Sequence, residues 1–248
     1  MTRALCTAIL VAAVPAMAQI CIERGYNVGQ NIPDGGQYVD SRVISNGGIT
    51  NITDVNVTLN LSSPVAGNSM WLGDLYLSLT HGTAFENERV AVLLNRPGRN
   101  NTDQWGSDLT SLAITLDDSV AVPNVYNITS ATGVYQADGR IAVDPYASPA
   151  AYNSGQVTAG LSALNGAWLE SNRWSLLVAD TEQYAVARLD SWRLTITGFG
   201  AETGTLDPGA GGSISDAGSE SNNLGAVVLV DGTGENAVTA DVSNNLAL

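Results

Sequence analysis

The chain has 248 residues, a formal net charge of −14 and ten basic residues, all of them arginine. The phosphates of nucleic acid would repel so acidic a chain, so we expect no nucleic-acid partner. The length suits one large β domain with extensions, and the acidity suits a soluble protein that can meet divalent cations.

Residues 1–18 have the pattern of a secretory signal peptide. Arg3 precedes an apolar run, and the segment closes on the small-residue cleavage site Ala-Met-Ala. The run is too short to span a bilayer as a mature anchor, so we expect a secreted or periplasmic protein without a membrane span. Cleavage after Ala18 removes Cys6 and leaves Cys21 as the only cysteine, which excludes an internal disulfide.

The region 19–199 is dominated by short stretches in which apolar and polar side chains alternate, as they do in half-buried strands. Residues 19–48 are rich in Gly and Asn and contain a turn signal. We expect strands at residues 38–45, 54–61, 73–80, 89–94, 112–116 and 133–135. The strand 89–94 should pair with the strand 73–80 through the short connection between them, whereas most of 119–164 should be loop.

The segment 172–197 holds the largest apolar mass of the chain. It reads as two strands joined by a short polar connection, which together form a wall of a sandwich. Trp174 lies in the first strand, which is apolar on both faces and therefore central, and Asp180 ends it. In the second strand, Trp192 shares one face with Leu194 and Ile196.

Many short strands separated by turn signals, with no strong helical period after residue 18, predict an all-β fold: an antiparallel two-sheet β-sandwich. The expected domains are a signal peptide (1–18), the sandwich (19–199) and a tail (200–248). The tail has no aromatic and no basic side chain, which predicts a flexible acidic segment. Alternatively, its apolar run at 226–230 pairs with an exposed edge of another chain or domain.

Six segments resemble, in order, the successive blocks of the P domain, also called P/Homo B. They are GDLYLSLT (73–80), LLNRPG (93–98), LDDS (116–119), LSALNG (161–166), WSLLVAD (174–180) and LDSWRLTI (189–196). The resemblance covers roughly residues 30–199. In the family, this module follows the catalytic domain of kexin- and furin-type proprotein convertases and of many bacterial subtilisin-like serine proteases.

The resemblance implies a jelly-roll sandwich, secretion and a non-catalytic role that stabilises a serine endopeptidase and tunes its calcium and pH dependence. A secreted subtilisin-like protease, or another extracellular protein, is then the expected partner. The sequence departs from the family in three ways: no catalytic domain precedes the module in this sequence, an insertion lies between Tyr135 and Leu161, and Asp190 replaces the usual Asn. We therefore expect no enzymatic activity from this chain itself.

The sequence gives little support for a catalytic site in this chain. A Ser/His/Asp relay would need His81, the single histidine, which we expect in a turn or at the surface. A glycosidase pair could be drawn from Asp117 and Asp118 or from Glu170 and Asp180. Neighbouring residues of a strand face opposite sides, however, and no motif supports the second pair.

Calcium is the cofactor that the residues favour, because it takes six to eight oxygen ligands from carboxylates, amides and carbonyls. Four aspartates fall at expected strand ends, where a sandwich could gather them at one edge: Asp74, Asp117, Asp118 and Asp180. Asp103 and Asp108 of the long loop could join them. Alternatively, these aspartates cap turns by accepting backbone N–H groups.

Trp71, Trp105 and Trp168 are less clearly patterned than the two strand tryptophans. An exposed tryptophan on a sandwich can hold a sugar ring, so an extracellular adhesion or carbohydrate-binding module is the alternative function. The same residues could instead cover the edges of the core.

Overall fold

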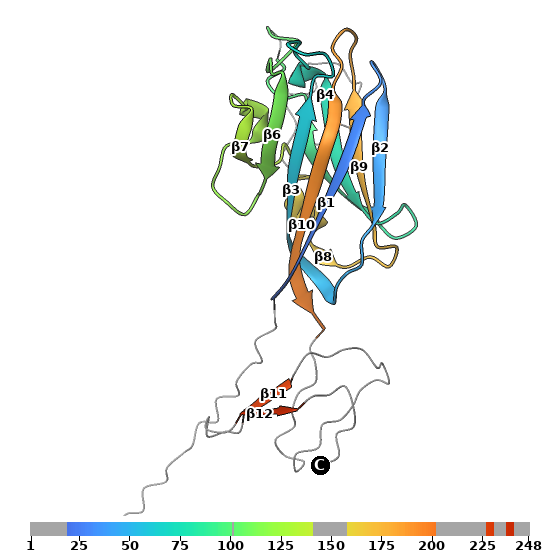
Figure 1. The fold of residues 1–248 in the computed structure, drawn as a ribbon, viewed down its shortest axis with the longest axis vertical. Coiled ribbons are helices and arrows are strands. Elements are labelled where there is room, and N and C mark those ends of the chain that lie inside the picture. Colours follow the sequence, from blue (N-terminus) through green and yellow to red (C-terminus); the bar gives the residue numbers. More distant parts are fainter. Residues whose placement is uncertain (1–18, 101, 141–157, 202–226, 231–236, 241–248) are drawn as a thin grey trace, which may run out of the picture. The chain divides into compact units, whose positions relative to one another are not determined.

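The structure, a computed structural model, describes residues 19–100, 102–140, 158–201, 227–230 and 237–240. The expected signal peptide lies outside these residues, as does most of the insertion after Tyr135. Two layers of β-sheet make up residues 19–201 (Figure 1). The helices described are short 3-10 turns: η1 (Leu72–Asp74), η2 (Val125–Asn127) and η4 (Leu161–Leu164). None of the helices in the described ranges is long and apolar enough to cross a membrane.

The first layer is a six-stranded sheet in the order β1-β10-β3-β6-β7, with β8 paired to β3. Its strands are β1 (Gln19–Asn31), β3 (Ile49–Ser62), β6 (Ser111–Leu116), β7 (Thr132–Tyr135), β8 (Gly166–Ala167) and β10 (Arg188–Gly200). All pairs are antiparallel except β6 and β7, which run parallel. The all-β sandwich predicted from the sequence is confirmed, with this one parallel pair as a departure.

The second layer is a four-stranded antiparallel sheet in the order β2-β9-β4-β5. Its strands are β2 (Gln37–Val43), β4 (Leu75–His81), β5 (Arg89–Asn95) and β9 (Arg173–Asp180). The predicted pairing of β4 with β5 is confirmed, and β9 is central, as its two apolar faces indicated.

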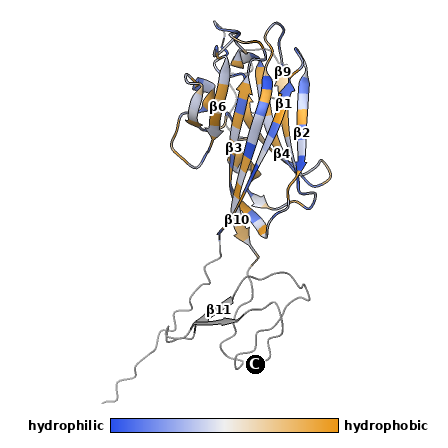
Figure 2. Cartoon of the chain, in the orientation of Figure 1, coloured by the Kyte–Doolittle hydropathy of each residue, from blue (hydrophilic) through white to orange (hydrophobic). Residues whose placement is uncertain are grey.

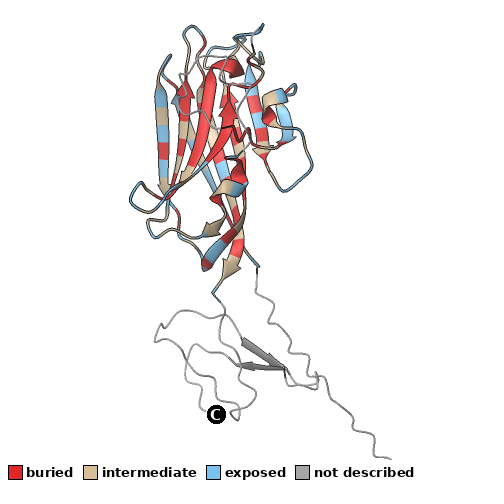
Figure 3. Cartoon of the chain, turned by 180° about the vertical axis from the view of Figure 1, so that it is seen from behind, coloured by how far each residue is buried: buried red, intermediate tan, exposed pale blue. Residues whose placement is uncertain are grey.

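The core lies between the layers and follows the period-two patterns of the sequence. Hydrophobic and hydrophilic residues alternate along β3 and β10 (Figure 2), and in β3 the residues Val55, Val57, Leu59 and Leu61 are buried. Buried residues concentrate between the two layers, whereas loops and outer edges are exposed (Figure 3). The alternation is thus the direct cause of the sandwich, because one face of each strand must leave water.

Trp174 and Trp192 do not form one wall, contrary to the sequence interpretation. Trp174 lies on β9 in the four-stranded sheet and Trp192 on β10 in the six-stranded sheet, and both are fully buried. The connection between these strands therefore crosses from one sheet to the other. Periodicity indicates which face of a strand is buried, and both strands bury the expected face. It does not indicate to which of the two sheets a strand belongs.

The first strand, β1, was not expected. Its Gly and Asn residues suggested an irregular segment, yet it pairs with β10 over most of its length. Ile22 is buried, and Ile20, Tyr26 and Val28 pack partly buried against the core. β1 is an edge strand, where glycine and asparagine on the outer face are tolerated because only one side must pair.

Residues 202–248 form a separate compact unit. Within it, β11 (Val227–Val230) pairs with β12 (Ala237–Ala240) in an antiparallel hairpin. The apolar run of the tail is thus a strand, and its partner is a segment of the same chain.

Candidate metal site

Asp74 and Asp180 meet at one end of the four-stranded sheet. Asp74 closes η1 just before β4, and Asp180 is the last residue of β9. The register pairs Leu75 with Asp180, so the two aspartates come from neighbouring strand ends. The backbone N–H and the hydroxyl of Thr181 both donate to the Asp74 carbonyl, at 2.8 and 2.9 Å.

The backbone around Asp74 is fixed by close contact between two loops. The N–H of Gly73 donates to the Trp105 carbonyl at 3.0 Å. A Cβ on Gly73 would collide with that carbonyl, so only glycine fits here. The N–H of Arg96 donates to the Leu75 carbonyl at 2.8 Å. Three of the segments that resemble the P domain, at 73–80, 93–98 and 174–180, therefore meet at this corner.

Both carboxylates are withdrawn from water, and the Glu182 N–H, which donates to Asp180 Oδ1 at 3.4 Å, is the one hydrogen-bond donor that the described residues give them. Asp74 is 0% exposed and Asp180 is 1% exposed. Among the described residues, neither oxygen of Asp74 has a hydrogen-bond partner, nor does Oδ2 of Asp180. Burial, with the neighbouring Glu182 charge as a second cause, raises the pKa of Asp74 to about 7. Burial likewise raises the pKa of Asp180 to about 8.

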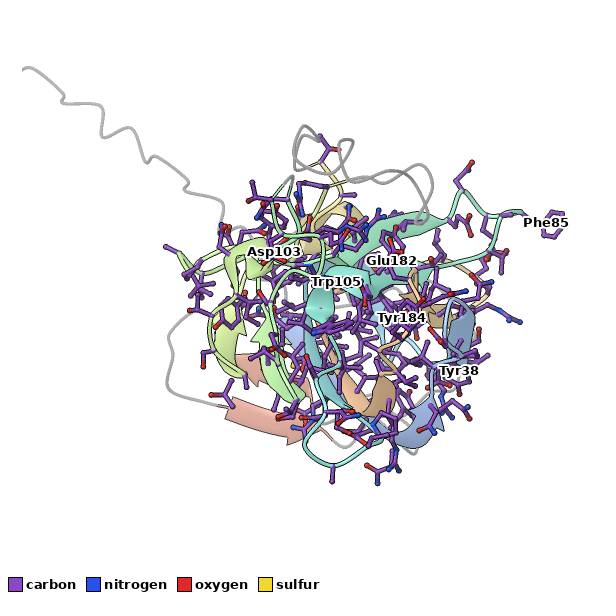
Figure 4. All side chains as sticks on the ribbon, turned by 90° about the horizontal axis from the view of Figure 1, so that it is seen from above. Tyr38, Phe85, Asp103, Trp105, Glu182 and Tyr184 are labelled. Atoms are coloured by element: carbon purple, nitrogen blue, oxygen red, sulfur yellow. The ribbon has the colours of Figure 1, made fainter. Side chains whose placement is uncertain are left out.

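Further acidic groups surround the pair. Glu182 and Asp34 both raise the pKa of Asp74, whereas Arg99 lowers it. Arg99 forms an ion pair of 2.7 Å with Glu182. Figure 4 looks down on the sandwich from above and shows Glu182 and Tyr184 near Trp105 in that view. The corner thus carries more negative than positive charge at neutral pH.

A hard divalent cation fits this donor set. The oxygens without partners on Asp74 and Asp180 are carboxylate oxygens, the ligands that calcium prefers, and a bound cation would remove the cost of burying them. Within the described ranges, no three His, Cys, Asp or Glu side chains converge in a metal-binding group. Calcium would therefore complete its shell with backbone carbonyls and water.

Of the four predicted ligands, Asp74 and Asp180 lie together, whereas Asp117 and Asp118 form hydrogen bonds elsewhere. Asp117 Oδ1 accepts from the backbone N–H and hydroxyl of Ser119, at 2.8 and 2.6 Å. Asp118 accepts from the N–H groups of Ala137 and Leu161, at 2.9 and 2.6 Å. Asp117 thus caps a turn, which was the alternative interpretation, whereas Asp118 holds backbone N–H groups of two segments distant in the sequence.

The loop aspartates that could have joined the site also behave differently. Asp103 Oδ1 accepts from the backbone N–H groups of Trp105 and Gly106, both at 3.0 Å. Asp108 is exposed. The residues missed by the sequence analysis at this corner are Arg99 and Glu182. A charge pair between two loops leaves no spacing signal in a sequence.

His81 is neither in a turn nor at the surface, so that expectation was wrong. It is the last residue of β4, fully buried, with its ring stacked on Trp174 at a centroid distance of 4.1 Å and 8° between the planes. Trp168 packs edge-on at 5.3 Å. Neither ring nitrogen has a hydrogen-bond partner among the described residues. Burial, the largest cause, lowers the pKa of His81 to about 4.

The three less patterned tryptophans are all half-buried. Trp168 packs against the core beside His81, and its indole N–H donates to Asn172 at 2.6 Å. Trp71 and Trp105 pack on each other with centroids 4.6 Å apart and planes tilted by 37°. A sugar ring would therefore find the two rings inclined to each other rather than coplanar.

No known protein-family model matches the chain. No curated protein matches it either. Among solved structures, it is similar to the Aeromonas sobria serine protease in complex with its chaperone ORF2, at 15% identity and a TM-score of 0.40. The match covers 76% of this chain and 28% of that one, so this chain spans under a third of the length of the structure that it matches.

Proposed function

We propose that this chain is a secreted, non-catalytic module that binds calcium and assists a subtilisin-like serine protease, as a P/Homo B-like domain. The observation that carries the proposal is the corner formed by Asp74 and Asp180. There, three segments that resemble the P domain meet around two buried carboxylates, three of whose four oxygens lack partners among the described residues. Such groups are costly in the ionised form unless a cation is bound.

Calcium would cross-link two strand ends and a loop at this corner. Asp74 and Asp180 would supply charged oxygens. The calcium ion would neutralise their charge and link the chain segments that carry its ligands, and it would take no part in a reaction. The module would then hold its loops rigid as a platform for the protease. Extracellular millimolar calcium suits a site with few protein carboxylates.

The surroundings of His81 support a non-catalytic role. It is the only histidine of the sequence. Its ring is enclosed by Trp174 and Trp168, and in the described part of the chain neither ring nitrogen has the hydrogen-bond partner that a relay requires. The structure supports a structural role for this side chain, as part of the aromatic core.

Calcium binding is tested by thermal unfolding of the mature chain with calcium chloride and with EDTA. We expect a higher Tm in millimolar calcium, reversed by EDTA, because the cation binds only the folded state. The shift should vanish in Asp74→Asn and Asp180→Asn and persist in Asp117→Asn, whose turn lies elsewhere. An unchanged Tm in millimolar calcium would overturn the metal site.

The accessory role is tested separately with a purified subtilisin-like protease secreted by the same organism. We expect the immobilised module to retain the protease, and the soluble module to lengthen the half-life of the protease on heating. Asp74→Asn should weaken both effects if the calcium corner supports the binding surface. A protease that is not retained and whose half-life is unchanged would contradict this role, even if calcium binds.

A further inference from the structure

The strand β2 is an open edge of the sandwich. It pairs with β9 along Gln37–Val43 without a register shift, and among the described residues no strand lies on its other side (Figure 1). It contains neither lysine nor proline nor a bulge, three of the devices that keep an edge strand from pairing with another chain. Such a strand is a template for a further strand.

The other edges of the two layers are protected. β1 has a register shift between Asn27 and Gln30, which interrupts its edge. β7 and β8 have only four and two residues. β5 is covered, because the N–H of Gly139 donates to the Val92 carbonyl at 2.9 Å and the N–H of Val92 donates to the Ala159 carbonyl at 2.7 Å. Of the edges that the structure describes, β2 therefore offers the longest uninterrupted one.

Alternate residues of β2 turn their backbone polar groups toward this free edge. At one end of the strand, the N–H of Asp180 donates to the Gly36 carbonyl at 2.8 Å. At the other end, the N–H of Ile44 donates to the Asn172 carbonyl at 2.8 Å. Bonding alternates along an antiparallel strand, so the even-numbered residues bond to β9. The N–H and C=O groups that face away from β9 are those of Gln37, Val39, Ser41 and Val43.

The side chains of the same residues are exposed and uncharged. Val39 is 48% exposed and Val43 is 73% exposed, so the fold of one chain gives these two valines little burial. The chain has a net charge of −14, but the outward-facing residues of β2 carry none of it. A second negatively charged copy can therefore approach this edge without a like charge at the point of contact.

The sequence of β2 is complementary to itself in an antiparallel arrangement centred on Ser41. In that register Val39 lies opposite Val43 of the second copy, and Asp40 lies opposite Arg42 of the second copy. Apolar pairs and pairs of opposite charge across two strands both stabilise a sheet. The free N–H and C=O groups of Val39, Ser41 and Val43 then meet the same groups of the second copy and exchange hydrogen bonds.

Charge selects this register over its neighbours. Because the free backbone groups lie on alternate residues, the next registers are shifted by two residues. One of them sets Asp40 against Asp40 of the second copy, and the other sets Arg42 against Arg42 of the second copy; like charges in these positions destabilise the pairing. Within each copy Arg42 Nε lies 2.9 Å from Asp40 Oδ1, so the favoured register brings two neutral ion pairs together and leaves no charge unpaired.

We propose that two copies of this chain form a symmetric dimer through β2, which joins their four-stranded sheets into one continuous sheet. The same strand serves both copies, so the contact is closed by a twofold axis and does not extend into a fibre. The protection of the other edges limits the assembly to two copies. This inference goes beyond the proposed function, and either can fail without the other.

Sedimentation velocity of the mature chain tests the dimer. We expect the mass to double as the protein concentration rises from about 1 μM to about 1 mM. The double variant Val39→Lys/Val43→Lys sets lysine against lysine and should stay monomeric, with an unchanged Tm at low concentration. The control Val65→Lys/Val120→Lys, at positions that are 53% and 39% exposed outside β2, should dimerise as the parent does. A monomeric parent at every concentration, or a β2 variant that still dimerises, would overturn the proposal.

Cross-linking tests the register. The exposed Cys21 is first removed by Cys21→Ser. In that background Ser41→Cys places two thiols opposite each other at a Cα separation of about 5.5 Å, which a disulfide can span. We expect a disulfide-linked dimer on mild oxidation. Gln37→Cys, on the same face of the same strand, lies opposite Ser45 of the second copy and should remain uncross-linked. No cross-link at Ser41→Cys, or equal cross-linking at both positions, would overturn this arrangement.

Discussion

The indole N–H of Trp192 donates a hydrogen bond of 2.7 Å to Asp40 Oδ2, across the two layers of the sandwich. Trp192 lies on the central strand β10 and Asp40 on the edge strand β2 of the opposite sheet. Arg42 forms an ion pair of 2.9 Å with the same carboxylate, and its guanidinium lies 4.6 Å from the ring centroid of Tyr26. This connection fixes the edge strand to the opposite layer.

Removing the indole donor should therefore destabilise the fold. Trp192→Phe keeps an aromatic ring but leaves the buried Asp40 with one hydrogen bond fewer, which costs about 1–3 kcal/mol in the free energy of unfolding. Urea denaturation measures the change. Val43→Ala, at a 73% exposed position of β2, the strand that carries Asp40, should leave stability nearly unchanged. Equal losses in the two variants would show that the hydrogen bond contributes nothing specific.

The buried acid pair predicts that stability falls as the pH rises from about 4 to about 8. The folded-state pKa values of Asp74 and Asp180 are about 7 and about 8, well above the ordinary aspartate value. Above the ordinary value, the folded state holds protons that the unfolded state has already released, so stability is lost until the pH has passed the folded-state pKa values. We expect a loss of about 4 kcal/mol between pH 6 and pH 8.5 in EDTA.

Urea denaturation in EDTA across this range measures the slope. Asp74→Asn and Asp180→Asn should each flatten it, and Asp117→Asn should not. Saturating calcium should also flatten it, because the cation stabilises the ionised carboxylates. A stability that rises with pH over this window in EDTA would contradict the assignment.

His81 predicts the opposite slope on the acid side. Its folded-state pKa is about 4 against an ordinary value of 6.5, so the unfolded state takes up the proton first. The stability that the neutral ring contributes is complete above pH 6.5 and is lost as the pH falls toward 4. The variant His81→Phe should remove this loss, because phenylalanine retains the stacking on Trp174 and has no nitrogen to protonate.

The same variant should raise stability at neutral pH. It removes two buried nitrogens that lack partners among the described residues, a gain of about 1 kcal/mol. His81→Ala, by contrast, leaves a cavity beside two tryptophans and should cost about 2–4 kcal/mol. Urea denaturation at pH 7 and pH 5 checks both values. A destabilised His81→Phe would indicate a hydrogen bond that the ring needs.

Tyr184 has a backbone conformation that favours glycine. Its φ is 91°, and its side chain is 83% exposed. Such a conformation costs a non-glycine residue about 1–2 kcal/mol, so Tyr184→Gly should stabilise the fold by about 0.5 kcal/mol after the loss of chain entropy. Phe85→Gly, at another exposed aromatic outside the positive-φ region, should not stabilise it. Urea denaturation of both variants against the parent makes the comparison.

The sequence predicted the secondary structure well where burial has period two. Residues 54–61 and 89–94 lie in strands, and the strand expected at 73–80 begins at Leu75, after the η1 turn. The pairing of the strands β4 and β5 followed from their short connection. The prediction failed for β1, one face of which is only partly buried. It also failed for the strands of Trp174 and Trp192, because tertiary packing decides which sheet each strand joins. Alternation fixes the face of a strand but not its neighbour.

The candidate metal site was predictable only in part, for a related reason. The position of Asp74 and Asp180 at strand ends was visible, whereas their pairing depends on the register between β4 and β9. The buried ion pair between Asp138 and Arg140, 2.6 Å from Oδ1 to Nε, lies in a span without periodicity. Only the short spacing between Asp138 and Arg140 could have indicated an ion pair, and such spacings are common.

The strand β10 lies between β1 and β3, so the first and last strands of the sandwich are direct neighbours, with Gln19 opposite Phe199. A chain that is synthesised from its N-terminus cannot complete this sheet until residue 200 has left the ribosome. Contacts between residues so distant in sequence slow folding and leave the unpaired edges of β1 and β3 open to aggregation meanwhile. Folding of the sandwich therefore depends on keeping the growing chain unfolded until its last strand arrives.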